Sequence, residues 1–167
     1  MVEKVIFADP EKCTGCRICE MACTLEQDGF IAPYNSRISI VKEEEQGINI
    51  PIVCQQCKDA PCAEVCPLNL YERNPETGAL EVRDESCIGC KACILACPYG
   101  ANLTHVESKV SIKCDLCGGE PTCVEFCPTD ALQYVRVDEL DKILKRSMFN
   151  KMSNTLKEMR KIKRGEK

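Results

Sequence analysis

The segment Cys87-Ile-Gly-Cys-Lys-Ala-Cys-Ile-Leu-Ala-Cys-Pro98 carries four cysteines separated by two, two and three residues. The chain repeats this pattern, with the middle gap widened in two copies, so that its 16 cysteines form four quartets with none left over. They are Cys13, Cys16, Cys19 and Cys23; Cys54, Cys57, Cys62 and Cys66; Cys87, Cys90, Cys93 and Cys97; and Cys114, Cys117, Cys123 and Cys127. The chain has no Trp, four Phe and four Tyr among 167 residues, too few for a large apolar core. The cysteines therefore decide the fold, because so thin a core needs cross-links.

The spacing within each quartet indicates a particular metal chemistry. Three close cysteines and a fourth soon after, commonly followed by proline, are typical of [4Fe–4S] ligand sets. Proline follows three of the quartets, at Pro67, Pro98 and Pro128, whereas Thr24 follows the first. Three thiolates on one tight loop reach three irons, and in two-cluster ferredoxins the fourth cysteine of each motif ligates the other cluster. The sequence therefore predicts four [4Fe–4S] clusters, and electron transfer as the function.

Disulfides and zinc are the alternative uses of these cysteines. Disulfides are typical of secreted domains. Residues 1–10 contain no apolar signal segment or twin arginine, and no later segment is apolar enough to span a membrane. We therefore expect a cytoplasmic chain with free thiols. Zinc typically takes two separated Cys-x2-Cys pairs, which contiguous quartets do not resemble, and iron and sulfide analysis distinguishes the two metals.

Charge is distributed unevenly along the chain. Residues 138–167 hold ten Lys/Arg and five Asp/Glu, a net charge of +5, whereas residues 1–137 carry a net charge of −9. Each oxidised cluster with four thiolates adds about two negative charges. The loaded body is therefore expected to be anionic, which disfavours nucleic acid and anionic lipid as partners.

Short strand and helix patterns lie between the quartets. A helix is predicted from Ile18 to Glu26, ending near Gly29, and alternating or β-branched runs predict short strands. The predicted strands cover residues 2–7, 37–41, 48–53, 70–73, 79–82, 101–106, 109–113 and 131–137. Quartets one and three share one spacing, and quartets two and four share a widened one. We therefore predict an α+β fold over residues 1–137, made of two fused ferredoxin-like units that bind two clusters each.

Residues 138–167 have a different character. Apolar side chains recur every three or four residues, which predicts a basic amphipathic helix of about six turns. They are Leu140, Leu144, Met148, Met152, Leu156, Met159 and Ile162. The helix could pack on its own domain or dock on a larger subunit. We favour docking, because the small body offers little surface to cover so long a helix.

Four quartets with a widened gap in the second and fourth resemble the four-cluster iron–sulfur subunits of the dimethyl sulfoxide reductase family. This resemblance covers residues 1–137 and implies a partner of the molybdenum or tungsten type. The segment Cys114-Asp-Leu-Cys-Gly-Gly-Glu-Pro-Thr-Cys123 is similar to small subunits of tungsten-dependent aldehyde oxidoreductases. Relatives in carbon monoxide dehydrogenase, hydrogenase and formate systems are alternatives within the same family.

The resemblance also implies a nested pairing. The fourth cysteine of motif one completes the ligand set of motif four, and the reverse, and motifs two and three exchange their fourth cysteines in the same way. The implied ligand sets are Cys13, Cys16, Cys19 and Cys127; Cys114, Cys117, Cys123 and Cys23; Cys54, Cys57, Cys62 and Cys97; and Cys87, Cys90, Cys93 and Cys66. Sequential pairing is the alternative.

The residues beside the motifs suggest a ranking of cluster potentials. Arg17, Lys58 and Lys91 follow the second cysteine of motifs one to three, whereas Gly118 stands there in motif four, with Asp115 close by. Reduction potential depends on charge near the cluster. We therefore hypothesise that the cluster held by motif four has the lowest potential.

The sequence thus predicts a non-catalytic subunit that relays single electrons through four clusters. Its partners would be a larger catalytic oxidoreductase subunit and a flavin or ferredoxin electron carrier. The chain contains no nucleotide-binding loop or acid–base constellation of its own. A free-standing polyferredoxin is the alternative, which has little need of a long amphipathic helix.

Overall fold

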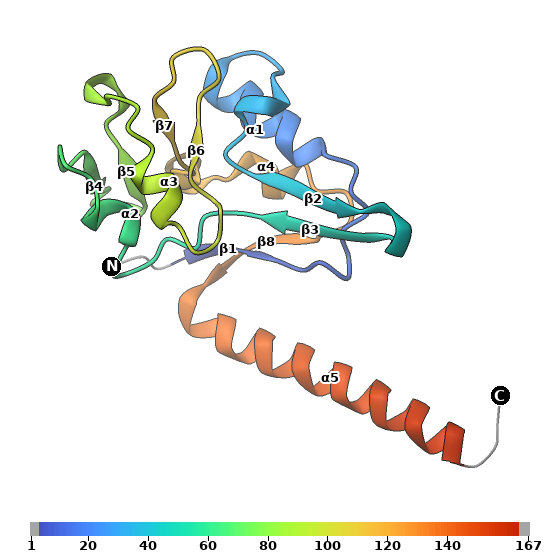
Figure 1. Cartoon of the computed structure of the whole chain (residues 1–167). Coiled ribbons are helices and arrows are strands. Elements are labelled where there is room, and N and C mark those ends of the chain that lie inside the picture. Colours follow the sequence, from blue (N-terminus) through green and yellow to red (C-terminus); the bar gives the residue numbers. More distant parts are fainter. Residues whose placement is uncertain (1–3, 164–167) are drawn as a thin grey trace.

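The computed structural model describes residues 4–163 and has a mixed helix and strand architecture (Figure 1). Over this range the strands pair as four antiparallel two-stranded ribbons. The ribbons are β1 (Lys4–Ala8) with β8 (Leu132–Arg136), β2 (Ser39–Glu43) with β3 (Ile48–Ile52), β4 (Tyr71–Arg73) with β5 (Leu80–Val82), and β6 (Leu103–Thr104) with β7 (Ser111–Ile112). Each expected strand region overlaps one of these strands, although β1 and β2 run one and two residues beyond the expected ends at residues 7 and 41; Val2 and Glu3 lie outside the described residues.

The helices are short, except for the first and the last. They are α1 (Ile18–Asp28), α2 (Pro61–Glu64), α3 (Ala92–Ala96), α4 (Thr122–Glu125) and α5 (Val137–Lys163). Single 3-10 turns occur at η1 (Pro33–Asn35), η2 (Glu44–Gln46), η3 (Asp84–Ser86) and η4 (Leu116–Gly119). Helix α1 lies against α4, and α2 lies against α3, so the first motif packs with the last and the second with the third.

A repeated turn explains why α2, α3 and α4 are short. The carbonyls of Cys66, Cys97 and Cys127 accept hydrogen bonds from the N–H groups of Asn69, Gly100 and Asp130 at 3.2, 3.3 and 3.4 Å. Proline at the second position of each turn presets φ and cannot continue the helical hydrogen-bond ladder. The turn ends at a residue with positive φ, a conformation that Gly, Asn and Asp adopt most readily. A strand begins two or three residues later.

The first motif lacks this proline, and its helix continues for another turn. Thr24 is fully buried, and its hydroxyl donates to the Met21 carbonyl at 3.1 Å and accepts from the Ala32 N–H at 3.1 Å. Helix α1 runs on to Asp28 and ends at Gly29, whose φ of 76° is left-handed.

Strands β1 and β8 join the two ends of the cysteine-bearing body. Their register places Ile6 opposite Tyr134, and only 1% of Ile6 is exposed. The main core cluster combines such side chains with buried cysteines, among them Cys19, Cys54 and Cys123. The interior is therefore built around sulfur, as the thin apolar composition predicts.

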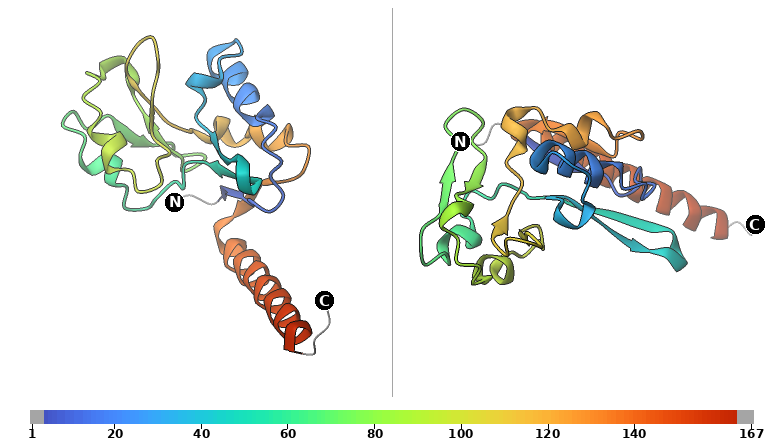
Figure 2. Two further views of the ribbon diagram at one scale, coloured as in Figure 1. Left: turned by 45° about the vertical axis from the view of Figure 1, so that its right-hand side comes forward. Right: turned by 90° about the horizontal axis from the view of Figure 1, so that it is seen from above.

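Helix α5 follows β8 directly at Val137 and projects away from the body (Figures 1 and 2). Its main contacts with the body are with β1 and β8. The sequence places the start of this helix at Asp138, one residue later, and residues 164–167 lie outside the described range. Within residues 4–163, no helix is both long and apolar enough to cross a bilayer.

Candidate metal centres

The structure gathers the cysteines around separate sites, and three of these sites are cavities that four cysteines border. We name the cavities site A, site C and site D. Site A is bordered by Cys13, Cys16, Cys19 and Cys127; site C by Cys54, Cys57, Cys62 and Cys97; and site D by Cys66, Cys87, Cys90 and Cys93. Each site combines three cysteines of one motif with the fourth cysteine of another.

Site B consists of the remaining four cysteines. Burial raises the pKa of Cys123, and the negative charges of Cys114, Cys23 and Cys117 raise it further. Cys23, Cys114 and Cys123 also share one buried cluster, to which the first motif contributes Cys23. Cys19 of site A belongs to the same buried cluster as Cys23, Cys114 and Cys123, so sites A and B are adjacent.

The four sites follow one another through the molecule. Cys114 of site B and Cys54 of site C belong to one buried cluster, so these two sites are neighbours. Cys62 of site C and Cys93 of site D share one buried cluster. The spatial order is therefore A, B, C, D.

Two left-handed residues shape the loops of motifs one and three. Gly15 and Arg17 flank the second cysteine of motif one, with φ of 70° and 61°, and Gly89 and Lys91 do so in motif three, with φ of 67° and 62°. Such loops turn successive backbone N–H groups toward a common side, where they stabilise an anion. At Gly89 only glycine fits, because a Cβ there would lie 2.8 Å from the Lys109 carbonyl oxygen.

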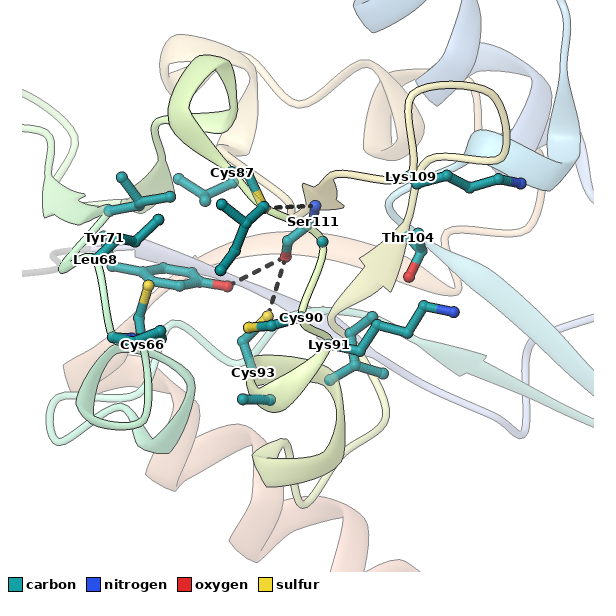
Figure 3. Close-up of a pocket in the computed structure, with 17 residues that line it drawn as sticks. Cys66, Leu68, Tyr71, Cys87, Cys90, Lys91, Cys93, Thr104, Lys109 and Ser111 are labelled. Atoms are coloured by element: carbon teal, nitrogen blue, oxygen red, sulfur yellow. Dashed lines mark hydrogen bonds between the residues drawn. The ribbon is translucent and has the colours of Figure 1, made fainter.

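Site D carries a polar network beside its sulfurs (Figure 3). The Ser111 N–H donates to Cys87 Sγ at 3.4 Å, and Ser111 Oγ lies 3.3 Å from Cys93 Sγ. Tyr71 Oη lies 3.2 Å from Ser111 Oγ and accepts from Asn102 Nδ2 at 2.8 Å. Hydrogen bonds to sulfur tune the potential of a cluster, and Ser111 is a residue that the sequence reasoning missed.

Backbone groups also approach sulfur at the middle sites. The Arg37 N–H donates to Cys23 Sγ at 3.3 Å in site B, and the Gln56 N–H donates to Cys54 Sγ at 3.4 Å in site C. Arg37 also forms an ion pair with Asp28 at 2.8 Å, and the side chains of both residues are largely buried. This pair anchors the end of α1 beside site B.

The surroundings shift the pKa values of the thiols in opposite directions. Burial raises the pKa of Cys19 to about 12, with smaller contributions from Glu20 and Cys16. At Cys127 burial also acts upward, but hydrogen bonds from the backbone of Leu132 and Thr129 outweigh it and lower the pKa. A buried thiolate needs a cationic partner, and a coordinating metal deprotonates its thiols. Four soft sulfur ligands around each cavity therefore fit a [4Fe–4S] cluster.

Exposure differs between the ends and the middle of this series. Cys16 in site A and Cys90 in site D are exposed, whereas Cys114, Cys123 and Cys23 in site B are buried. Sites A and D therefore each carry one exposed cysteine, whereas the cysteines of sites B and C are buried or half-buried.

Two family models match the chain. The 4Fe-4S dicluster domain matches residues 45–137, and a 4Fe-4S binding domain matches residues 10–28. The chain belongs to the 4Fe-4S dicluster family. The two matches together include all 16 cysteines of this dicluster protein.

Curated relatives of the dicluster protein are similar over most of their length. It is 46% identical to the polyferredoxin-like subunit of an aliphatic sulfonate oxidoreductase from Pyrococcus furiosus, over 78% of this chain and 76% of that protein. It is 42% identical to the putative electron transport protein YsaA of Escherichia coli, over 84% of this chain and 95% of that protein.

A solved structure is similar as well. The active-site complex BamBC of benzoyl coenzyme A reductase, determined with 1,5-dienoyl-CoA, contains a chain that is 26% identical with a TM-score of 0.50. The match covers 80% of the dicluster protein and 75% of that chain.

Proposed function

We propose that this protein is a non-catalytic electron-transfer subunit that relays single electrons through four [4Fe–4S] clusters, one at each of sites A to D. The spatial order of the four cysteine sites is the observation that supports this most directly. Bound clusters supply one-electron redox chemistry, while the chain positions them, shields the middle two and leaves the end two accessible.

The nested ligand assignment is part of this proposal. Each cavity borders three cysteines of one motif and one of another, in the combinations that the family resemblance implies. The packing of α1 on α4 and of α2 on α3 supports two fused units. The outer unit would hold sites A and B, and the inner unit sites C and D.

We further propose a larger catalytic oxidoreductase subunit as partner, of the molybdenum or tungsten type, with a flavin or ferredoxin carrier at the other end. The relative from Pyrococcus furiosus is named as an oxidoreductase subunit, and the solved chain lies in an active-site complex. YsaA is named only as an electron transport protein, which keeps a free-standing carrier as the second candidate. Reduced thiols and clusters suit a cytoplasmic setting.

We propose that residues 1–137 form the cluster domain and that residues 138–167 form a docking segment. Helix α5 is the docking element. Its apolar stripe includes Leu144, Met148, Met152 and Leu156, each at least 43% exposed. Beyond its first turns the helix projects from the body, so its own domain does not cover this stripe (Figure 2). Met adapts to irregular apolar surfaces, as a partner subunit presents.

Iron and sulfide analysis tests the relay. We expect the anaerobically purified chain to contain about 16 irons and 16 sulfides, since each of four clusters holds four of each. Four distinct reduced signals in potentiometric EPR would support the assignment. Zinc, or half the expected iron, would contradict it.

Co-purification from the native source tests docking. Met148→Glu/Met152→Glu introduces two negative charges on the apolar stripe and should abolish recovery of the catalytic partner with iron content unchanged. Arg146→Gln/Lys157→Gln removes two positive charges from the opposite face, since residues advance about 100° each around the helix. This control has the same net charge change and should retain the partner. Equal loss in both variants, or in neither, would refute docking through the stripe.

A further inference from the structure

Lys113 is a buried lysine at the centre of the molecule. It follows β7 directly and precedes Cys114 of site B, and only 7% of it is exposed. Its ammonium donates to Gln56 Oε1 at 3.1 Å, to the Cys114 carbonyl at 3.3 Å and to the Leu80 carbonyl. An ammonium group has three donors, so all of them have acceptors here.

None of these three acceptors carries a charge. Two carboxylates border the same polar cavity as Lys113, but both have other partners. Glu81 Oε1 accepts from Asn74 Nδ2 at 2.9 Å. Asp115 Oδ1 accepts from the Cys117 N–H at 3.0 Å. Burying a charge without a counter-charge is costly, so Lys113 needs negative charge from another source.

The cysteines of two sites supply that charge. Lys113 itself borders the site C cavity, together with Cys54, Cys57 and Cys62. Its ammonium also donates to the carbonyl of Cys114, a residue of site B. The ammonium therefore stands between sites C and B and acts on both.

Gln56 holds the lysine in this place. It comes from the loop of motif two, has a positive φ of 50° and is 3% exposed. Its Nε2 donates to the Cys114 carbonyl at 2.9 Å, and its Oε1 accepts from the Leu80 N–H at 2.9 Å as well as from Lys113. The Gln56 side chain thus connects a loop of site C to a ligand residue of site B.

We propose that Lys113, positioned by Gln56, is a fixed counter-cation that raises the reduction potentials at sites B and C together and so keeps electron transfer between them close to balanced. The inference rests on the proposed four-cluster relay. One electron leaves one site and arrives at the other, and no bond forms or breaks. The added electron makes either site more negative, and a buried cation stabilises that state more strongly than an exposed one.

Lys113→Met tests the proposal by removing the charge while keeping most of the side-chain volume. In potentiometric EPR of the loaded full-length protein, we expect two of the four midpoint potentials to fall. At a fixed solution potential, the ratio of reduced to oxidised cluster should drop at least tenfold, which corresponds to 59 mV for one electron. Lys145→Met makes the same charge change on exposed α5 and should shift none.

Gln56→Glu is the second variant, because it keeps Lys113 and places a carboxylate beside it. It should lower the same two potentials with iron content at the wild-type level. A wild-type protein without four clusters would refute the proposed function itself. Four clusters with unshifted potentials in Gln56→Glu, or an equal shift of all four, would overturn only the role of Lys113.

Discussion

Gly89→Ala should weaken site D much more than the matched change Gly118→Ala weakens site B. Both glycines lie beside the second cysteine of a motif and have nearly equal φ, 67° and 64°. Alanine in this left-handed conformation costs about 1–2 kcal/mol at either position. A Cβ at Gly89 would also lie 2.8 Å from the backbone oxygen of Lys109, whereas a Cβ at Gly118 meets nothing within 4 Å. Relieving such an overlap costs about 1–3 kcal/mol.

Relative to the wild-type protein, the open fraction of site D in Gly89→Ala should therefore rise roughly fivefold to 150-fold more than that of site B in Gly118→Ala. Iron chelation from a transiently open site follows the open fraction when closing is fast. The assay is the anaerobic loss of iron–sulfur absorbance in the presence of excess chelator, with EPR identifying the signal that disappears first. An equal acceleration of iron loss in Gly89→Ala and Gly118→Ala, each measured against the same signal in the wild-type protein, would refute the reasoning. Both variants carry the cost of the left-handed conformation, and only Gly89→Ala carries the contact with Lys109.

Three further predictions concern single side chains. Asp115→Asn removes a negative charge beside site B and should raise one cluster potential in potentiometric EPR; unchanged potentials would remove the basis for a low-potential cluster there. Ser111→Ala removes the hydroxyl 3.3 Å from Cys93 Sγ and should lower the potential of site D alone, and a rise would contradict the role given to that contact. Asn35→Ala leaves the Val106 N–H, which donates to Asn35 Oδ1 at 2.9 Å, without its partner, and should cost about 1–3 kcal/mol in thermal unfolding of the loaded protein. An unchanged melting temperature would show that water replaces the amide.

The sequence predicts those features of the fold that local chemistry controls. Proline after the fourth cysteine predicts the short helices, and its absence at Thr24 marks the one motif whose helix continues to Asp28. The strand regions follow from alternation and turn residues in the same way. The ribbon of β6 and β7 is shorter than the pattern suggests, with two residues in each strand. Its neighbours are the buried polar groups of sites C and D, which local patterns do not describe.

The surroundings of the sites were less predictable, because they depend on segments far apart in the chain. A lysine before a cysteine is usually a solvated charge, and the ranking of potentials from Arg17, Lys58 and Lys91 does not consider Lys113. Its burial results from the approach of Gln56, 57 residues earlier. The serine of site D was missed for the same reason. The spacing identifies the cysteines, whereas tertiary packing brings beside them the groups that adjust the reduction potentials.

The pairing of β1 with β8 has a consequence for biosynthesis. Lys4 emerges from the ribosome early, but its partner in the sheet, Arg136, is among the last residues of the body. At about 5–20 residues per second, the first strand waits roughly 7–26 s for the last. During that time Cys13, Cys16 and Cys19 lack Cys127, while the cysteines that border sites C and D have all been made once Cys97 appears. Translation therefore favours completion of the inner half first, and a chain cut short between Cys97 and Cys114 would carry the full cysteine sets of sites C and D alone.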